Sequence, residues 1–383
     1  MDRDLAVLLG VTLIGIIGVA ILSPAFPEIK RGLNLSDFEV AMLVTVFTLP
    51  GIFVAPLMGV LADRFGRKKV LIPSLFLFGV AGTACAFVNF KLMLIFRFLQ
   101  GIGGSALTSL VVTLIGDMYD GLKRIKALGY NACALSLGLA SYPIIGGLLA
   151  ELNWRYPFLT FISAIPIGLL AMRLRYPDIK QGSSLPRYIK NSFDLFRDKY
   201  ITLCLFSGCV VFIITSGTFV MYIPILLQNE FNLPPSLRGL IQSFSLLITA
   251  LIAFKINSFV KTFGYTGTIK LGFISYAISL IIIFSTPSLY LFVVAMMIFG
   301  IGHGTVLPSL QNLIVTLAPT ENRAVITTTY GSMIRVGQTI GPILASTVAM
   351  YSIKYVFLVS TILSLCLVIV NHFIKLNDEA NIN

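Results

Sequence analysis

The sequence predicts an all-α membrane protein of twelve transmembrane helices, arranged as two pseudo-symmetric six-helix bundles. Three observations support this fold class. Of the 383 residues, 57% are hydrophobic and 11% are charged, whereas soluble domains carry about 25% charged residues. Apolar runs of about 20 residues, long enough to cross a bilayer as a helix, recur from end to end. Landmarks of the first half also return in the second half about 199 residues later, as in proteins built from two parallel repeats.

The apolar runs do not alternate as barrel strands do, and lipid offers no partner to unpaired backbone groups, so helices are expected. The basic stretch 176–199 divides the chain into an N-terminal half (1–175) and a C-terminal half (200–383) with a short tail. The expected spans are 5–27, 38–62, 70–88, 91–116, 127–150, 156–175, 200–228, 237–257, 268–286, 288–314, 323–348 and 353–375.

The net charge of +12 is distributed as expected for a membrane protein with both termini in the cytoplasm. About 20 of the 28 basic residues then fall inside, in agreement with the positive-inside rule. This excess favours contact with anionic lipid over nucleic acid. We therefore expect a multi-pass protein of the cell membrane, with the sequon at Asn34 on the outer side. The basic residues expected outside are Lys30, Arg31, Lys91, Arg155, Arg238 and Lys354.

Neither the cysteines nor the histidines suggest a catalytic or metal site. The five cysteines lie in apolar runs without a C-x-x-C pair, which is typical of thiols packed as small hydrophobic groups. The two histidines, His303 and His372, do not supply a metal cluster or a nucleophile–base pair. We expect no enzyme activity and no cofactor, with protons as the candidate coupling ion.

The most densely charged segment is G-V-L-A-D-R-F-G-R-K-K at 59–69, between two apolar runs. The positive-inside rule, which favours basic residues in cytoplasmic loops, would explain its lysines and arginines. It would explain neither its aspartate nor its glycines. The segment strongly resembles the loop between helices 2 and 3 of the major facilitator superfamily of secondary transporters. The resemblance implies a latch at the cytoplasmic ends of the two halves, with a glycine that permits close helix contact and an aspartate at a neighbouring helix N-terminus. The implied latch residues are Gly59, Asp63, Arg64, Gly66, Arg67 and Lys68.

The fourth apolar run contains an arginine, Arg97, followed by Gln100 and Gly101. This pattern is similar to the R-x-x-Q-G motif of the same superfamily. An arginine within a span costs about 2.5–3.5 kcal/mol on insertion scales, so it usually faces a cavity or a partner. The alternative is that Arg97 extends its charged end to the membrane surface. We expect a role of these three residues in transport or coupling.

A second motif in the fifth run resembles the exporter motif G-x-x-x-G-P-x-x-G-G. In the family this motif is associated with export, and its spacing favours a pliable, closely packed helix. A tyrosine replaces the second glycine of the motif in this chain. The residues that match or replace the motif positions are Gly138, Tyr142, Pro143, Gly146 and Gly147.

The second half contains the other polar groups within apolar runs. His303 and Arg335 are expected near mid-depth, and the run 331–342 resembles helix 11 of twelve-helix drug–proton antiporters. Arg335 needs water, carbonyls or an anion as a partner, whereas His303 could equally be a structural hydrogen-bond donor. Gln311 and Gln338 are weaker candidates for a substrate cavity, since polar side chains also join helices together.

These features predict a secondary transporter of a small organic solute, acting by proton-coupled efflux through alternating access. Every aspartate and glutamate lies at a helix end or in a loop; Glu28 and Asp117 come closest to the interior, and His303 is the interior group that could titrate near neutral pH. A basic interior favours anionic or neutral amphiphiles over cations. The alternatives are an importer or facilitator of organic anions or sugars and, more remotely, a transporter-like receptor. We expect a monomer that binds a small-molecule substrate.

Overall fold

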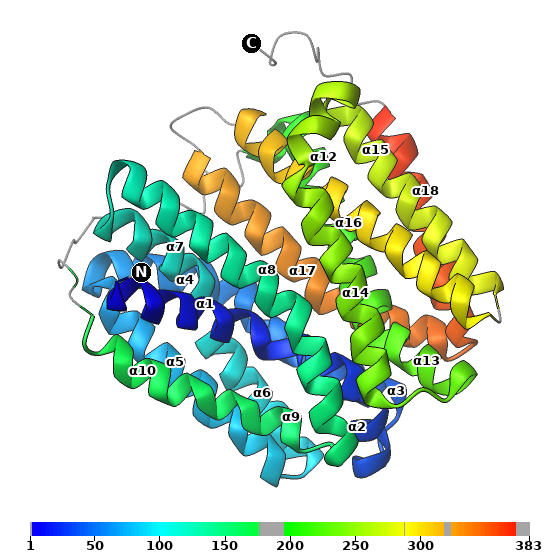
Figure 1. The fold of residues 1–383 in the computed structure, drawn as a ribbon, viewed down its shortest axis with the longest axis horizontal. Coiled ribbons are helices and arrows are strands. Elements are labelled where there is room, and N and C mark those ends of the chain that lie inside the picture. The colour runs from blue at the N-terminus through cyan, green and yellow to red at the C-terminus, as the bar shows by residue number, and fades with distance from the viewer. Residues whose placement is uncertain (1, 175, 177–194, 287, 318–322, 373–383) are drawn as a thin grey trace. The chain divides into compact units, whose positions relative to one another are not determined.

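The computed structural model describes residues 2–174, 176, 195–286, 288–317 and 323–372, and contains no strand in these residues. The predicted all-α fold is confirmed. The helices form two compact units (Figure 1). Unit 1 contains Met1–Tyr188 and the short segment Pro234–Gly239, and unit 2 contains Ile189–Leu233 and Leu240–Asn383. The inclusion of Pro234–Gly239 in unit 1 was not predicted.

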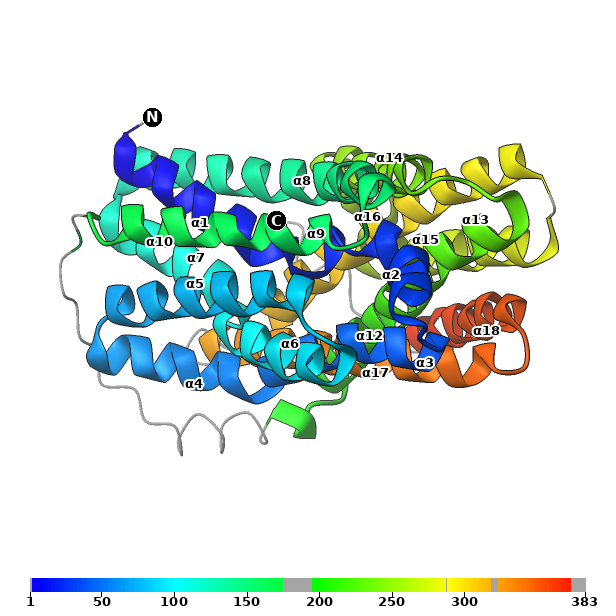
Figure 2. The ribbon, with the colours of Figure 1, turned by 90° about the horizontal axis from the view of Figure 1, so that it is seen from below.

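Unit 1 is a bundle in which α1 packs along α8, and α5 packs against both α6 and α10. Figure 2 shows α4, α5 and α6 side by side, as their contacts require. The elements of unit 1 are α1 (Arg3–Ala20), η1 (Ser23–Ala25), α2 (Phe26–Leu33), α3 (Asp37–Thr48), α4 (Pro50–Phe65), α5 (Arg67–Ala84), η2 (Cys85–Phe87), α6 (Phe90–Gly104), α7 (Leu107–Met118), α8 (Gly121–Leu152), α9 (Tyr156–Leu159), η3 (Thr160–Ser163) and α10 (Ala164–Ala171).

Unit 2 is built around α15, which packs against α16 and α18, while α12 packs along α17. Between α12 and α13 the helix widens into a π-helical segment, η5. The elements of unit 2 are η4 (Leu195–Arg197), α12 (Lys199–Ile213), η5 (Ile214–Tyr222), α13 (Ile223–Phe231), α14 (Pro235–Phe254), α15 (Ile256–Ser285), α16 (Leu289–Leu317), α17 (Arg323–Ala349) and α18 (Ile353–His372). The first turn of α14 belongs to unit 1.

Ten helical segments in the described parts of the chain are long and apolar enough to cross a membrane. They correspond to ten of the twelve expected spans. The remaining two are the shorter apolar segment Tyr156–Ala171 and α17, which contains Arg335 and Gln338. Helix α8 runs past its expected end, since it begins at Gly121 instead of 127, whereas α15 begins at Ile256 but is interrupted at Gly264, before the expected span 268–286. Apolar periodicity marks the part of a helix in lipid, whereas polar turns beyond it remain helical in water.

Local sequence signals explain where several helices begin and end. Asp2 caps α1 by accepting a hydrogen bond from the Leu5 backbone N–H at 2.8 Å. Ser36 and Glu39 form a reciprocal capping box at the start of α3, an arrangement that satisfies two backbone donors. At the end of α2, Asn34 adopts a left-handed conformation with φ of 54°, which asparagine tolerates better than most residues.

The charged segment 59–69 is helical on both sides of a single glycine. Helix α4 continues to Phe65 and α5 starts at Arg67, so Gly66 alone separates them. Gly66 has φ of 101° and ψ of 135°, a conformation that side chains with a Cβ rarely adopt. Gly264, the matching residue of the second half, breaks α15 with φ of 68°. The repeat inferred from the sequence is therefore present in the backbone.

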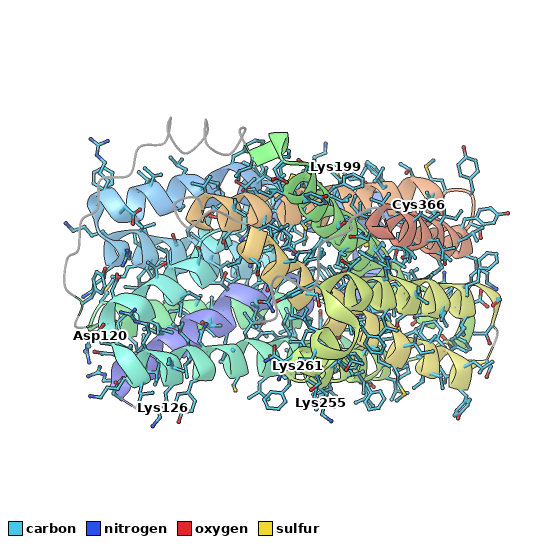
Figure 3. All side chains as sticks on the ribbon, turned by 90° about the horizontal axis from the view of Figure 1, so that it is seen from above. Asp120, Lys126, Lys199, Lys255, Lys261 and Cys366 are labelled. Atoms are coloured by element: carbon cyan, nitrogen blue, oxygen red, sulfur yellow. The ribbon has the colours of Figure 1, made fainter. Side chains whose placement is uncertain are left out.

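Large apolar side chains cover much of the outer surface of both units. Phe53, Leu152 and Phe254 are 72%, 75% and 89% exposed, as expected for side chains that face lipid. Exposed charged groups such as Asp120 and Lys126 instead lie near helix ends. Figure 3 shows Asp120 and Lys126 projecting from one end of unit 1, near the start of α8. The polar ends and apolar flanks of these helices are those of membrane-embedded bundles.

Candidate transport and gating sites

The predicted latch has its ionic partner within unit 1. Arg67, which is 5% exposed, forms an ion pair with Asp117 near the end of α7. The Tyr176 hydroxyl donates to Asp117 Oδ2 at 2.7 Å and accepts from Arg67 Nη1 at 3.1 Å. Asp63 Oδ1 lies 3.8 Å from Arg67 Nη2. The four side chains join α4, α5, α7 and the segment after α10.

The other latch residues differ in their surroundings. Lys68 Nζ donates to the Leu174 carbonyl at 3.1 Å, so it also holds the segment after α10. Arg64 is exposed and lies over the Phe65 ring. No atom lies within 4 Å of a Cβ built on Gly59, and its part in a close helix contact stays a prediction. The placement of Asp63 at a helix N-terminus stays a prediction.

Arg97 does not reach the membrane surface, since it is fully buried at 0% exposure. Its Nε donates to the Leu43 carbonyl of α3 at 3.1 Å, and its Nη1 donates to the Gly18 carbonyl of α1 at 3.1 Å. Nη1 also donates to Gln100 Oε1 at 2.7 Å, and the guanidinium carbon lies 4.2 Å from the centre of the Phe47 ring. Arg97 thus joins α1, α3 and α6. A direct role in coupling stays a prediction.

The residues after Arg97 explain how α6 comes so close to its neighbours. A Cβ on Gly101 would collide with the Phe47 backbone carbonyl. Gln100 is fully buried, and its Nε2 has no hydrogen-bond partner in the described part of the protein. Gln100 thus has an unused donor beside the buried arginine. Leaving a buried amide N–H without a partner costs about 1–3 kcal/mol.

The exporter motif lies on α8, and its glycines lie where two backbones meet. A Cβ on Gly146 would collide with the Ile21 carbonyl, and one on Gly147 with the Pro235 carbonyl at the start of α14. The carbonyl of Pro143 faces Gly239 in the same way. Here α8 contacts both the end of α1 and the first turn of α14, all within unit 1.

The remaining two motif residues bring α8 onto α1 one to two turns earlier. A Cβ on Gly138 would lie 2.7 Å from a terminal atom of Ile16, so this contact involves a side chain that can move. The Tyr142 hydroxyl donates to the Leu13 carbonyl at 3.0 Å. The tyrosine that replaces a motif glycine therefore fastens α8 to α1, which a glycine could not do.

Tyr142→Phe is expected to lower the stability of unit 1 only slightly, by about 0.6 kcal/mol, which is the average for hydrogen bonds between membrane helices. Apparent melting temperature in detergent is the measurement. Tyr130→Phe is the matched control, since Tyr130 lies on the same helix and is 52% exposed. A loss of folding in Tyr142→Phe would show that the hydroxyl contributes far more than one interhelical bond.

In unit 2, His303 lies in an aromatic cluster beside the π-helical segment. Its Nδ1 is hydrogen-bonded to the Tyr276 hydroxyl, and its ring stacks on Phe299 with 16° between the planes. Phe299 in turn stacks on Phe219 of η5, with ring centres 5.0 Å apart. Phe212 contacts the His303 ring edge-on. π-helical turns often occur at functional sites, so this cluster is the strongest candidate site of unit 2.

The other polar candidates of unit 2 lie on α16 and α17. Arg335 and Gln338 are half-buried on α17, and Gln311 on α16 is exposed. Beside them, a Cβ on Gly337 would collide with the Cys209 carbonyl of α12. This close approach brings α17 against the helix that carries Phe212. Their roles in substrate binding stay predictions.

A link to the N-terminus that sequence reasoning missed joins Asp2 and Tyr119. The Tyr119 hydroxyl donates to Asp2 Oδ1 at 2.8 Å. The pKa of Asp2 lies below its ordinary value, chiefly because its carboxylate accepts the Leu5 backbone N–H and also because of the Tyr119 hydroxyl. Burial and the neighbouring carboxylate raise the pKa of Tyr119. The described residues contain no group of three or more His, Cys, Asp or Glu that could hold a metal ion.

Comparisons with known proteins place these sites in context. A family model of the Major Facilitator Superfamily matches residues 8–254 and 205–382. The bacillibactin exporter of Bacillus subtilis (strain 168) is 28% identical over 400 aligned positions, which cover 98% of both proteins. Multidrug resistance protein 1 of the same strain is 26% identical over 94% of this chain and 92% of its own length. The crystal structure of nucleoside transporter NupG has a TM-score of 0.82 at 15% identity, over 97% of this chain and 99% of its own, which shows a shared fold.

Proposed function

Because the chain belongs to the Major Facilitator Superfamily and is a membrane transporter, we propose that it exports a small organic solute in exchange for protons. In this proposal the protein works by alternating access, exposing its substrate site first to one side of the membrane and then to the other. Membership of the family supports transport and nothing more specific. The direction, the coupling ion and the substrate class each need a separate argument.

The contact made by the exporter motif carries the argument for export. Gly146 of α8 meets the Ile21 carbonyl with no room for a side chain, and Gly147 meets Pro235 in the same way. Because α8 packs backbone to backbone against these neighbours, no bulky side chain has to move if the helices separate. The full-length similarity to two Bacillus subtilis proteins that are named as an exporter and a multidrug resistance protein supports the same direction.

Two kinds of group could carry the proton. Asp117 is already held by Arg67 and Tyr176, so its proton exchange would require that cluster to open. His303 is bonded to Tyr276 and surrounded by aromatic rings, and an imidazole can accept and release a proton. In our proposal protons move through groups of this kind.

For the substrate, we propose an organic anion or a neutral amphiphile. Arg335 remains charged at every physiological pH and lies on α17, the helix that packs along α12. Phe212 and His303 offer aromatic surface in the same unit. A guanidinium and aromatic surface within one unit suit a planar anionic solute, whereas a cation would be repelled.

An importer of organic anions or sugars is the second candidate, because a basic interior would serve uptake of an anion equally well. We further propose that the protein is a monomer in the cell membrane, with both termini cytoplasmic and with its basic helix ends near anionic lipid. Lys255 and Lys261 lie on the outside of unit 2, where they could meet lipid headgroups (Figure 3).

The test of the proposed function is transport into inside-out proteoliposomes with an acidic lumen. We expect labelled organic anions and neutral amphiphiles to accumulate while the lumen becomes more alkaline, and cations to accumulate poorly. Arg335→Ala is expected to reduce anion uptake by tenfold or more, since about 1.4 kcal/mol of lost interaction is a factor of ten. His303→Gln should reduce lumen alkalinisation more than substrate binding.

Arg155→Ala is the matched control for Arg335→Ala, because Arg155 is exposed at the end of unit 1 and stacks on Trp154. It should transport like the unmodified protein. Accumulation that is driven only in right-side-out vesicles would favour the importer. Efficient transport of cations without transport of anions would contradict the proposed substrate class.

A further inference from the structure

A buried tyrosine of α15 holds the imidazole ring of His303 from one side. The Tyr276 side chain is 0% exposed, and its hydroxyl is hydrogen-bonded to His303 Nδ1. The backbones of α15 and α16 fix this approach, because a Cβ on Gly302 would lie 2.8 Å from the Gly272 carbonyl and 3.3 Å from the Tyr276 ring. The glycine beside His303 thus makes room for the tyrosine that contacts it.

The direction of this hydrogen bond follows from the chemistry of its two partners. A phenol O–H is a stronger donor than an imidazole N–H, and a neutral imidazole nitrogen is a stronger acceptor than a hydroxyl oxygen. Thr215 of η5 also lies near the Tyr276 hydroxyl, but its own proton is donated to the Val211 carbonyl at 2.8 Å. The Tyr276 O–H therefore donates to His303 Nδ1. Since a neutral imidazole has one N–H, the proton of the ring is then on Nε2.

The second ring nitrogen of His303, Nε2, is available to a ligand. It forms no hydrogen bond with the described residues and is not fully enclosed, since the side chain is half-buried. Phe299, which is 3% exposed, covers one face of the ring. Phe212 meets the ring edge-on with centres 6.4 Å apart and is itself half-buried. A solute that reaches this cluster thus meets an N–H group beside an aromatic side chain.

The position of the ring proton decides which chemical group His303 selects. With the proton on Nε2, the ring is a donor and suits an oxygen acceptor such as a carboxylate or a phenolate. Hydrogen bonds to an ionised oxygen are about twice as strong as those between neutral groups. With the proton on Nδ1, Nε2 would instead accept, and it would suit an amine or an ammonium group. The hydroxyl of Tyr276 therefore controls the specificity of an atom on the opposite side of the ring.

We propose that Tyr276 is a positioning residue for substrate recognition. Its hydroxyl keeps the proton of His303 on Nε2, and the Nε2–H group donates a hydrogen bond to an oxygen atom of a planar aromatic anion. No covalent bond is made or broken. This assignment rests on the proposed organic-anion substrate, for which it names the contact atom, and it does not depend on which group carries the coupling proton.

The first test is a ¹⁵N NMR spectrum of the histidine ring in purified protein. The chain contains two histidines, so a His372→Gln background leaves His303 as the labelled residue. Couplings to the ring C–H protons distinguish Nδ1 from Nε2. At a pH of about 8, where a histidine ring is neutral, we expect the proton on Nε2 and a hydrogen-bonded Nδ1. Tyr276→Phe should remove that hydrogen bond and populate both proton positions. A proton on Nδ1 in the parent protein would overturn the assignment.

The second test measures the substrate contact with naphthoate, a planar aromatic carboxylate, and with naphthylmethylammonium as the matched cation. Naphthoate at saturation should shift the Nε2–H signal, and the cation should not. His303→Leu should weaken naphthoate binding about tenfold or more, as expected for the loss of a hydrogen bond to a charged group. His303→Gln should bind more tightly than His303→Leu, because its amide N–H reaches the place of Nε2. Tyr276→Phe should weaken binding about two- to fivefold, since only rings with the proton on Nε2 are competent.

Tyr330→Phe is the matched control for Tyr276→Phe. Tyr330 belongs to the same unit and is 3% exposed, and its hydroxyl has no hydrogen-bond partner in the described part of the chain. Removal of this hydroxyl should leave the ring signals and the naphthoate affinity unchanged. Equal changes in the two variants would indicate a general loosening of unit 2 and would overturn the assignment. A single symmetric peak in size-exclusion chromatography establishes that each variant is folded.

Transport in proteoliposomes separates this assignment from the proposed function. Naphthoate that shifts the Nε2–H signal of His303 but is not transported would support the contact while the proposed export fails. Failure to bind naphthoate, or binding without a change at Nε2, would overturn the contact. Export of naphthoate with an unchanged KM in Tyr276→Phe would overturn the role of the tyrosine and leave the proposed function standing.

Discussion

Replacing Arg97 by alanine is expected to lower the free energy of unfolding of unit 1 by about 3–5 kcal/mol, as for other large buried side chains. The substitution leaves a void between α1, α3 and α6, and it removes the hydrogen bonds to the Gly18 and Leu43 carbonyls. It also leaves the buried Gln100 without its charged partner. The apparent melting temperature in detergent should fall by roughly 10 °C, given about 2–4 °C per kcal/mol for a unit of this size.

Arg155→Ala is the control for this prediction, because it compares two arginines that both lie over an aromatic ring. Arg155 lies 4.6 Å from the Trp154 ring and is exposed, and an exposed cation–π contact contributes about 0.5–1 kcal/mol. Arg97→Lys should fall between the two alanine variants, since it keeps the charge without the planar fork. Equal melting temperatures for Arg97→Ala and Arg155→Ala would contradict a structural role for the buried arginine.

Gly146→Ala is expected to force α8 away from α1 and to abolish most transport. The added methyl group would collide with the Ile21 backbone carbonyl, and backbone cannot turn aside as a side chain can. Overpacking of this kind costs about 1–3 kcal/mol, against which alanine returns at most about 1 kcal/mol of helix propensity. Melting temperature and initial export rate should both fall.

Gly129→Ala provides the comparison on the same helix. No atom lies within 4 Å of a Cβ at Gly129, so only the gain in helix propensity remains, and stability should stay constant or rise. Gly59→Ala should behave like Gly129→Ala for the same reason. Normal transport by Gly146→Ala would mean that α1 and α8 separate without consequence, and would remove the main support for export.

Much of the fold follows from apolar run length and charge placement, because a bilayer imposes both. The residues at which helices begin and end are harder to predict from run length and charge placement. The charged residues at 59–69 suggest a loop, but α4 and α5 continue through them up to Gly66 on either side. Once backbone bonds are satisfied within a helix, charged side chains can extend into water from it. The glycine between them was the informative signal.

Pairing between distant residues was the part that sequence could not supply. The motif indicated a role for Arg67, but its contact with Tyr176 spans 109 positions, and the Glu28–Arg238 bond spans 210. Neither Tyr176 nor Arg238 has a local pattern that distinguishes it from a residue at the membrane surface. Gly59 is a related case, since a glycine removes a side chain without specifying which neighbour approaches.

Two of the positive-φ glycines, Gly66 and Gly264, show how the halves have diverged. Gly66 and Gly264 keep the same unusual backbone turn, yet the residue three positions earlier is Asp63 in one half and Lys261 in the other. The two halves thus share a positive-φ glycine at this turn but carry opposite charges three residues before it. A partner that attracts the first turn, such as a helix N-terminus, is repelled by the second. The two turns are alike in backbone, but the charge at the matching position differs in sign between them.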